Sequence, residues 1–496
     1  MSEERTEQQD IQALAKGGRT NILGFVLRLA GNIPFLFIAG RLYGAEALGR
    51  FAFAVAVVEL AVQLCTLGQK RGLAQELARE DAHPANVVAD GMLLSAALTV
   101  VVALGFYLFP ILVFPSGGHN EIDRLIPLVM VPMVLTDIAL SAQAYRFDVA
   151  TTVRARALVE PWTRSILAGV LWFVIPESGM IIAYLASVFA TAAAALWPVY
   201  KTYGLPRAWQ PQPLKLGQLA LGNLPLAVAD AVEWGTRRLD LAILGIFAGP
   251  KAVGVYYVAQ QIASLPQKFK TSFEPVLGPV ITRNLKEQNY LAISKQVCQV
   301  GFWITAAQTA VALALGIPGE GVMGLTGPAF VGGTGAMAVL LTAEVVASAA
   351  VVSEAALIYV KRMVNLWLSL ATVAVQVLAS VGLILLAKQL GLGELYWAAA
   401  VAGGLLIALG FASVTKSLVL AKFLGHPANP WRWSVIWAMA PAVVVGWFVT
   451  AYLPEWAELA FGIPAILAAY CWVLWVKGFG PEDKVLFRRN VGAGSE

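Results

Sequence analysis

Apolar segments long enough to cross a lipid bilayer follow one another along almost the whole chain. A spanning helix needs roughly 20 apolar residues, and the sequence predicts about fourteen such helices. Of the 496 residues, 58% are hydrophobic and only 13% are charged, whereas soluble domains carry about 25% charged residues. Because so few charges cannot cover a soluble surface of this size, we expect a membrane protein, and disordered, collagen-like and nucleic-acid-binding classes are excluded.

The expected fold is therefore all-α and polytopic, with two parallel-repeat six-helix bundles followed by two added C-terminal helices. The helices are predicted near 21–43, 47–68, 88–114, 122–145, 152–175, 179–200, 217–248, 252–281, 291–316, 335–359, 363–387, 394–420, 433–453 and 457–476. The predicted organisation is a tail (1–20), an N-terminal bundle (21–203), a C-terminal bundle (217–420), two further helices (431–477) and a second tail (478–496).

Lysine and arginine are concentrated in every second connection between these helices and at the adjoining helix ends, including the stretches that hold Lys70, Arg71 and Arg156. Positive charge marks the cytoplasmic side of a membrane protein. The distribution therefore predicts an even number of helices with both termini in the cytoplasm.

A short glycine motif occurs twice in the chain. Gly44-Ala-Glu-Ala-Leu-Gly49 resembles Gly249-Pro-Lys-Ala-Val-Gly254, at an offset of 205 residues. Six predicted helices separate the copies, so the repeat is parallel rather than inverted. Parallel halves with a substrate path between them are a known plan for transporters. The alternative interpretation is a chance match between two short stretches of small residues.

Polar residues inside the apolar helices recur at the same offset. The second helix carries Glu59, Gln63, Thr66 and Gln69 on one face, and adding 205 gives positions within the polar face of the eighth helix, which holds Gln260, Ser264, Lys268, Thr271 and Glu274. Arg28 and Asn32 of the first helix correspond to Glu233 and Arg237 of the seventh, which also carries Asp230 and Asp240. Polar groups in spanning helices are costly unless they face water or a partner. The pattern predicts an aqueous cavity between two halves.

The residue types in this predicted cavity favour an anionic ligand. Arg28, Arg237, Arg238 and Lys268 are the basic candidates for binding it, and guanidinium and ammonium groups suit a pyrophosphate or another anion. Ion coupling and further polar contacts are assigned to Asn32, Glu59, Gln63, Asp230, Glu233, Gln260, Ser264 and Glu274, since buried carboxylates can carry protons. The structural alternative is that Arg237 pairs locally with Glu233 and that Glu59 bonds a neighbouring helix.

Enzymatic motifs are missing from the sequence. There is no Walker A motif, and Cys65, Cys298 and Cys471 stand alone in apolar segments. The three histidines fall in predicted loops. Gly319-x-Gly321-x-x-Gly324 matches a dinucleotide fingerprint, but no strand precedes it. The sequence therefore predicts no enzyme activity, no metal site and no cofactor.

The chain resembles the polysaccharide transporter family, the Wzx-type oligosaccharide flippases of the multidrug/oligosaccharidyl-lipid/polysaccharide exporter superfamily. The resemblance is carried by Ala15-Lys-Gly-Gly-Arg-Thr-Asn-Ile-Leu-Gly24, by Arg41-Leu-Tyr-Gly-Ala-Glu-Ala-Leu-Gly-Arg-Phe-Ala52 and by Arg238-Leu-Asp240 with Gly249-Pro-Lys-Ala-Val-Gly-Val-Tyr256. It extends loosely over the full length through size, helix count and repeat. The family's central cavity is cationic, and the acidic Glu59, Asp230 and Glu233 depart from that pattern, which leaves the coupling ion open.

The resemblance implies a bacterial inner-membrane flippase that moves undecaprenyl-diphosphate-linked glycan by alternating access during surface polysaccharide assembly. It implies the bilayer, a polysaccharide polymerase and glycosyltransferases as partners, and no nucleic acid. Two alternatives stay open at this point. One is a cation-coupled multidrug exporter on the same fold, and the other is a membrane-embedded glycan polymerase or ligase.

Overall fold

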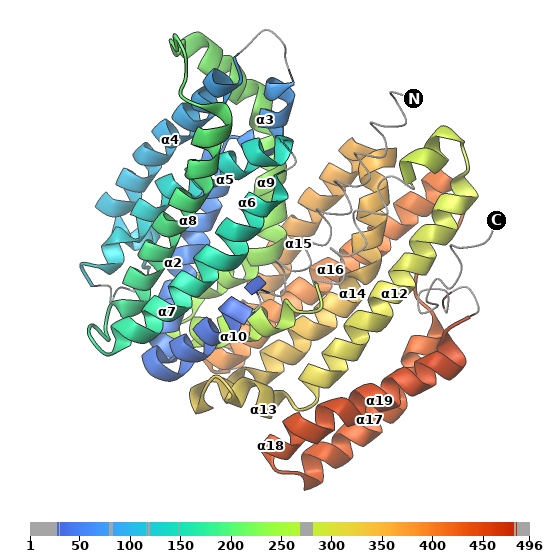
Figure 1. The fold of residues 1–496 in the computed structure, drawn as a ribbon. Helices are drawn as coiled ribbons and strands as arrows, with labels where there is room; N and C mark the ends of the chain where they lie inside the picture. Colours follow the sequence, from blue (N-terminus) through green and yellow to red (C-terminus); the bar gives the residue numbers. More distant parts are fainter. Residues whose placement is uncertain are drawn as a thin grey trace, which may run out of the picture. The chain divides into compact units, whose positions relative to one another are not determined.

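The computed structural model describes residues 27–28, 30–78, 83–115, 117, 120–146, 148–267, 281–480 and 483. These residues form helices joined by turns and irregular connections, and they contain no strand. The chain divides into two compact units, Met1–Gly254 and Val255–Glu496. The all-helical prediction is therefore confirmed for the described part of the chain (Figure 1).

The first unit is a bundle of long helices (Figure 1). Residues 30–43 are helical and end in a π-helical turn, η1 (Ala39–Tyr43). They are followed by α2 (Gly44–Cys65), α3 (Gln69–Leu77), α4 (Pro84–Leu108), η2 (Pro110–Leu112), η3 (Asp123–Val129), α5 (Met130–Tyr145), α6 (Val149–Val153), η4 (Arg154–Val159), α7 (Glu160–Trp172), α8 (Gly179–Tyr203) and α9 (Pro213–Phe247). The next helix, α10 (Pro250–Ala263), begins in this unit and continues into the second.

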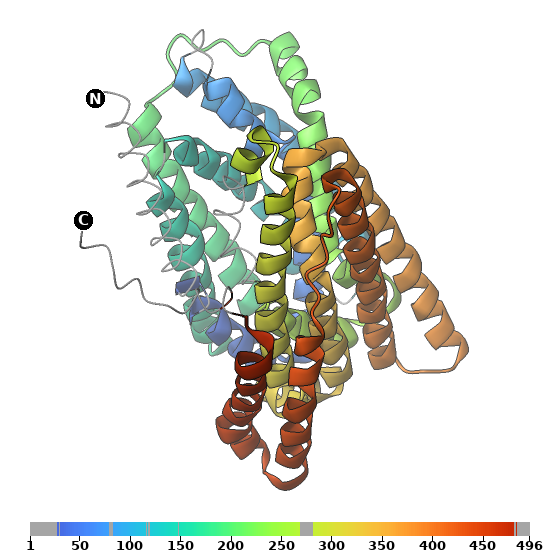
Figure 2. The same cartoon turned by 90° about the vertical axis from the view of Figure 1, so that its right-hand side faces the viewer.

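The second unit holds the remaining helices. These are α12 (Tyr290–Gly316), α13 (Gly319–Gly324), η5 (Pro328–Gly333), α14 (Thr334–Val360), α15 (Arg362–Gln389), α16 (Glu394–Leu424), α17 (Trp433–Tyr452), α18 (Glu455–Ala457), η6 (Glu458–Gly462), α19 (Ile463–Val473) and η7 (Leu474–Gly478). The last helices form an antiparallel hairpin, with α17 packed on α19 and α18 at its tip (Figure 2).

Ten helical segments among the described residues are long and apolar enough to cross a membrane. One of them, Ala30–Leu77, covers two of the predicted helices. The predicted helices near 152–175 and 217–248 are present as α7 and α9 but carry charged side chains. The predicted helix near 252–281 is present as α10, which ends at Ala263 and is followed by a turn at residues 264–267; residues 268–280 lie outside the described part of the chain.

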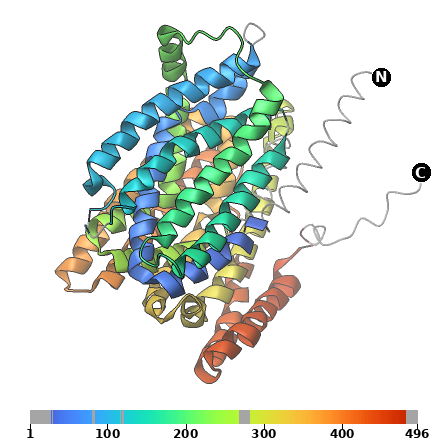
Figure 3. The same cartoon turned by 60° about the vertical axis from the view of Figure 1, so that its left-hand side comes forward.

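Large apolar side chains build the core of the first unit. Leu48 and Val58 of α2 and Ile138 of α5 are 0% exposed. Phe51 stacks edge-on against Tyr184 of α8, with 5.2 Å between ring centroids. These contacts hold α2, α5 and α8 together, and α7 packs on α8 beside them (Figure 3).

Helix α12 joins two apolar clusters in the second unit. Ile293 and Val297 pack with Val352 of α14 and Leu420 of α16. Further along α12, a second cluster includes Phe302, Ala306 and Leu313 together with residues of α17 and α19. The terminal hairpin is therefore attached to the second unit through α12.

Other helices present apolar side chains outward. In α4, α15 and α17, only 28% of the apolar stretch that could span a membrane is buried inside the protein. In Glu455–Gly478 the buried share of that stretch is 22%. Val101, Leu104 and Trp447 are more than half exposed. Soluble monomers rarely expose apolar patches on this scale, so these faces fit contact with lipid.

The predicted domain boundaries stay a prediction. Helix α9, which they place in the C-terminal bundle, packs against α2, α3 and α4 within the first unit. The tail 1–20 and most of the tail 478–496 lie outside the described residues.

Candidate functional site

The first unit brings together most of the polar residues predicted from the sequence. Arg28 and Asn32 come from the first helix, Glu59 and Gln63 from α2, and the remainder from α9. The α9 residues are Asp230, Glu233, Arg237 and Arg238. Additional charged residues from α3, α5, η4 and α7 complete the network.

Arg71 of α3 connects its helix to α9. Its Nε atom lies 2.9 Å from Asp230 Oδ1, and its Nη2 atom donates to Glu233 Oε2 at 2.8 Å. Glu233 also accepts a hydrogen bond from Arg237 at 3.1 Å. The local pairing of Arg237 with Glu233, raised as a structural alternative, is therefore present, but it belongs to a network that joins two helices.

The helices α3 and α9 approach closely at this link because glycine lines it. Gly68 has φ +69° and begins the turn into α3. A Cβ atom at Gly68 would lie 2.6 Å from the carbonyl oxygen of Asn223 and 2.8 Å from the nitrogen of Ala227. Only glycine fits this backbone conformation and spacing without displacement.

A second link joins α2 to α9. Arg238 Nε lies 3.8 Å from Glu59 Oε2, a distance longer than a hydrogen bond. The Arg238 and Glu59 side chains are 32% and 27% exposed, so the pair is partly open to its surroundings.

Asp137 of α5 lies at the centre of a third group. It is 2.8 Å from Lys70 Nζ and accepts from Arg156 Nη2 at 2.5 Å. Lys70 also donates to Gln63 Oε1 at 2.7 Å, and Arg156 also donates to Glu160 Oε2 at 2.9 Å. Five elements of the first unit thus meet in one network of ion pairs and hydrogen bonds: α2, α3, α5, η4 and α7.

The N-terminal segment joins this group through η4 and α7. Arg28 Nε donates to the carbonyl oxygen of Arg156 at 3.1 Å. Arg164 donates to Asn32 Oδ1 at 2.5 Å and lies over the ring of Phe35 at 4.5 Å. Arg28 and Asn32 are therefore held beside the ion pairs of η4 and α7.

We call this network the charged belt. Its basic members are Arg28, Lys70, Arg71, Arg156, Arg164, Arg237 and Arg238, and its acidic members are Glu59, Asp137, Glu160, Asp230 and Glu233. Basic side chains outnumber acidic side chains in the belt. Guanidinium groups bind phosphate oxygens in the same bidentate way as they bind carboxylates, so an anion can replace a carboxylate partner in such a network.

The candidates of the eighth helix do not belong to the belt as described. Gln260 lies on α10 and is partly buried, and Ser264 donates to the carbonyl oxygen of Gln261 at 2.7 Å. Lys268 and Glu274 lie outside the described residues. Their predicted roles, and the predicted cavity between two halves, stay predictions.

Several belt residues were not among the sequence candidates. Lys70, Arg71 and Arg156 fall in helices rather than in connections, and their basic character suggested only an orientation signal. One sequence signal was available for Arg156, because its spacing of four to Glu160 is typical of a helical ion pair. The contacts of Asp137 join helices far apart in sequence, so spacing could not reveal them.

The two glycine motifs of the repeat contact each other reciprocally. A Cβ at Gly49 would overlap the carbonyl oxygen of Pro250, and a Cβ at Gly254 would overlap that of Ala45. At the repeat offset of 205 residues, positions 45 and 49 correspond to positions 250 and 254. Each copy of the motif therefore presents the same surface to the other, as expected for a two-fold relation. This contact argues against a chance match of small residues.

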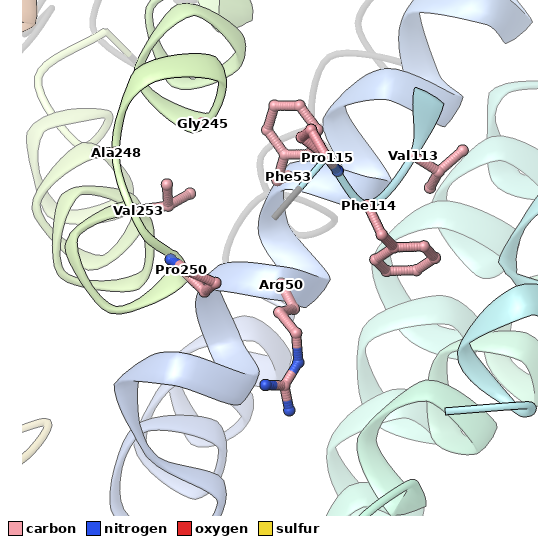
Figure 4. Close-up of a pocket in the computed structure, with 10 residues that line it drawn as sticks. Arg50, Phe53, Val113, Phe114, Pro115, Gly245, Ala248, Pro250 and Val253 are labelled. Atoms are coloured by element: carbon pink, nitrogen blue, oxygen red, sulfur yellow. The ribbon is translucent and has the colours of Figure 1, made fainter. Parts of the chain in front are cut away.

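A small hollow lies beside this contact. Figure 4 shows Arg50 on α2 next to Pro250, with Phe114 and Pro115 on the segment after α4. It holds about 10 Å³, which is about the space of one water molecule. It is too small for a lipid-linked sugar, and its residues are not those of the belt. Within the described ranges, no group of three potential ligand residues could hold a metal ion.

Solved transporters of one superfamily share the fold. The lipid II flippase MurJ, in an inward closed conformation, matches with a TM-score of 0.70 at 12% identity, covering 94% of this chain and 100% of that chain. An inward-facing multidrug resistance MATE family transporter of the MOP superfamily gives 0.66 at 15%, covering 80% and 98%. A MOP superfamily transporter from Pyrococcus furiosus gives 0.58 at 16%, covering 83% and 95%. The chain thus has the fold of a multi-pass membrane transporter.

The sequence itself defines the family. A family model of polysaccharide biosynthesis proteins matches residues 18–285, which is more than half of the chain, and the chain belongs to this family. A search of curated proteins gives no match. The chain is therefore a member of the polysaccharide biosynthesis protein family with the fold of MOP superfamily transporters, and the family resemblance noted in the sequence is confirmed.

Proposed function

We propose that the protein moves a polyprenyl-diphosphate-linked oligosaccharide from the inner to the outer leaflet of the bacterial inner membrane by alternating access. In this proposal both termini are cytoplasmic. Glycosyltransferases supply the undecaprenyl-diphosphate-linked substrate, and a polysaccharide polymerase uses it for O-antigen, exopolysaccharide or capsule. The protein binds and releases its substrate without covalent chemistry, so it is not an enzyme.

The observation that supports this proposal best is the arrangement of arginines in the charged belt. The side chains of Arg71 and Arg237 are 48% and 52% exposed while they share Glu233. Partly exposed guanidinium groups can exchange a carboxylate for a phosphate oxygen at low cost, because both partners accept the same paired hydrogen bonds. A diphosphate group would therefore bind at Arg71, Arg237 and Arg238, and the carboxylates would take the arginines back on release.

A cation-coupled drug exporter is the second candidate, and the acidic members of the belt favour it. In the structure, however, Asp137, Asp230 and Glu233 each form an ion pair with a basic side chain. An organic cation would have to displace a lysine or arginine from these carboxylates. An anion must likewise displace a carboxylate from the arginines, but the seven basic side chains of the belt outnumber its five acidic ones, and this excess favours an anionic substrate.

A deletion strain tests the function. We expect loss of surface polysaccharide and accumulation of lipid-linked units on the inner leaflet. Increased drug sensitivity with normal polysaccharide would instead support the exporter, and a defect in polymer length alone would support a polymerase.

The double variant Arg237→Ala/Arg238→Ala tests the site. We expect export in the complemented strain to fall at least tenfold while membrane abundance stays at the wild-type level. Arg283→Ala is the matched control, because Arg283 forms an exposed ion pair with Glu287 at the same spacing of four, outside the belt. Normal export in the double variant would refute the assignment.

A further inference from the structure

A lysine lies almost completely buried in the second unit. The side chain of Lys416 on α16 is 4% exposed. Its Nζ atom lies 3.1 Å from Glu354 Oε2 of α14 and donates to Ser369 Oγ of α15 at 3.0 Å. The three helices pack together in the second unit (Figure 1). An ionisable side chain inside a spanning bundle is costly to keep, and such groups usually mark a pathway for ions or protons.

Helix α15 presents a line of polar residues in this bundle. Asn365, Ser369, Thr372, Gln376 and Ser380 follow one another at steps of four, three, four and four. Such spacing places them on a single helix face. We call this face the polar track, and Ser369 connects it to Lys416.

Several atoms of the polar track have no hydrogen-bond partner among the residues that the structure describes. Gln376 is 0% exposed, and within those residues neither its amide nitrogen nor its amide oxygen is bonded. The same holds for Ser380 Oγ, also at 0% exposure, and for Asn365 Oδ1. Buried polar atoms in a membrane protein require a partner, and ordered water is the usual one where protein supplies none. The track therefore suits a row of water molecules that leads along α15 to Lys416.

The two partners of the ion pair differ in access. The side chain of Glu354 is 34% exposed, against 4% for Lys416. Of the two groups, the carboxylate is therefore the more accessible. Lys416 also opposes binding of a metal cation at Glu354, because its positive charge lies only 3.1 Å away.

Other charged groups in this part of the second unit have different surroundings. The helices packed against α16 carry Lys295 on α12, Glu344 and Glu354 on α14, and Arg362 and Lys388 on α15; α16 itself adds Glu394 and Lys422, and Lys361 joins α14 to α15. Glu344 accepts from Gln267 at 2.5 Å. Lys361 lies over the ring of Phe423, and Lys388 over that of Trp397. Glu354 is thus the acid placed against Lys416.

We propose that the Lys416–Glu354 pair binds the proton that drives transport, an inference that rests on the proposed function and names its coupling ion. A proton from water adds to a carboxylate oxygen of Glu354, an O–H bond forms, and the ion pair is lost. Lys416 keeps its three protons and its bond to Ser369. A buried ammonium group without its counter-charge is unfavourable, so protonation favours a different packing of α14 and α16. Loss of the proton restores the pair and the first packing, and the cycle couples proton entry to the conformational change.

Purified protein in liposomes tests the coupling. The probe is a fluorescent polyprenyl-diphosphate monosaccharide, and its flipping is followed with and without an imposed pH gradient. We expect the gradient to accelerate flipping by wild type about tenfold. In Glu354→Gln and Lys416→Met the gradient should change the rate by less than twofold. Lys422→Met is the matched control, since Lys422 is exposed near the end of α16, and it should keep the full effect.

The double variant Glu354→Gln/Lys416→Met guards against misfolding, because it leaves no unpaired charge at the site. Elution as a single species in size-exclusion chromatography establishes its folding. The rate at which it flips the probe should also be independent of the pH gradient. A full gradient effect in Glu354→Gln or in the double variant would overturn the proposal. So would wild-type flipping driven by a sodium gradient and not by a pH gradient.

An infrared pH titration separates this proposal from the proposed function. Wild type should gain a protonated-carboxyl band on acidification that Glu354→Gln lacks, whether or not the probe is flipped. Absence of that difference would refute the proton site. A clear difference without any flipping of the probe would instead refute the proposed substrate.

Discussion

Asp137 offers the sharpest test of how the charged belt contributes to stability. Its side chain is 13% exposed and lies against both Lys70 and Arg156. The variant Asp137→Asn keeps the size of the side chain and removes its charge. Two basic groups then lose a shared counter-charge inside the bundle, while Lys70 keeps Gln63 and Arg156 keeps Glu160 as partners.

The size of the effect follows from these contacts. Breaking a fully buried ion pair costs about 3–5 kcal/mol. Lys70 and Arg156 are 26% and 21% exposed and each retains one acceptor, so screening and the remaining bonds reduce the loss to about 2–3 kcal/mol. For a folding unit of this size, a loss of about 1 kcal/mol lowers the melting temperature by about 2–4 °C. We therefore expect a decrease of about 4–12 °C.

The assay is thermal unfolding of the purified protein in detergent, followed by intrinsic tryptophan fluorescence. Glu46→Gln is the control, because it breaks the pair of Glu46 with Arg50, in which Glu46 is 68% exposed. Such surface pairs contribute about 0.3–0.5 kcal/mol, so the control should melt close to wild type. If Asp137→Asn melted as high as Glu46→Gln, the belt would not be a stabilising network.

Two further predictions use the same assay. Gly68→Ala should melt several degrees below wild type, because the new Cβ would press on the α9 backbone and the residue has a positive φ. The control Gly222→Ala, whose Cβ meets only open space on α9, should melt at or above the wild-type temperature. The reverse order of melting temperatures would contradict the close packing of α3 on α9. Burial raises the pKa of the Asp483 carboxyl, but hydrogen bonds from Arg432, Gly480 and Trp303 outweigh it and hold that pKa below its ordinary value. A lowered pKa stabilises the fold above the unfolded-state pKa of about 3.9 and loses this effect as pH falls through the folded value. Asp483→Asn should therefore melt below wild type at pH 7, with the gap closing below about pH 4, and a gap that persisted in acid would exclude the carboxylate as its source.

The fold was predictable because the bilayer imposes simple rules on sequence. Each spanning helix requires a long apolar run, and the predicted positions of the described helices agree with the structure to within a few residues at most ends. The repeat was also visible, since the contact between its copies requires glycine at Gly49 and Gly254. The amphipathic pattern after Arg71 indicated a helix on the inner surface, but it did not reveal that this helix, α3, packs against α4, α5 and α9.

The belt was predictable only in part, because its geometry depends on helix packing. Helical spacing identified the α9 residues Asp230, Glu233 and Arg237, which share one face. It could not identify Arg71, because a positive charge near a helix end fits an orientation signal equally well. The contact of Arg71 with Asp230 joins residues 159 positions apart, and no short-range pattern encodes it.

The pairing within the belt bears on how the proposed substrate would be released. An anion site made of unpaired arginines would hold a diphosphate tightly, and each release would leave uncompensated charge inside the bundle. In this structure the carboxylates Asp230 and Glu233 already hold Arg71, so the empty site has its charges satisfied. The net free energy of substrate binding is then only the difference between two similar sets of hydrogen bonds, one to the carboxylates and one to the diphosphate. Replacing Glu233 with glutamine should therefore strengthen binding of the lipid diphosphate to purified protein and slow its export, because the competing partner is weakened. Weaker binding in Glu233→Gln would show that the carboxylate positions Arg71 and Arg237 instead of competing for them.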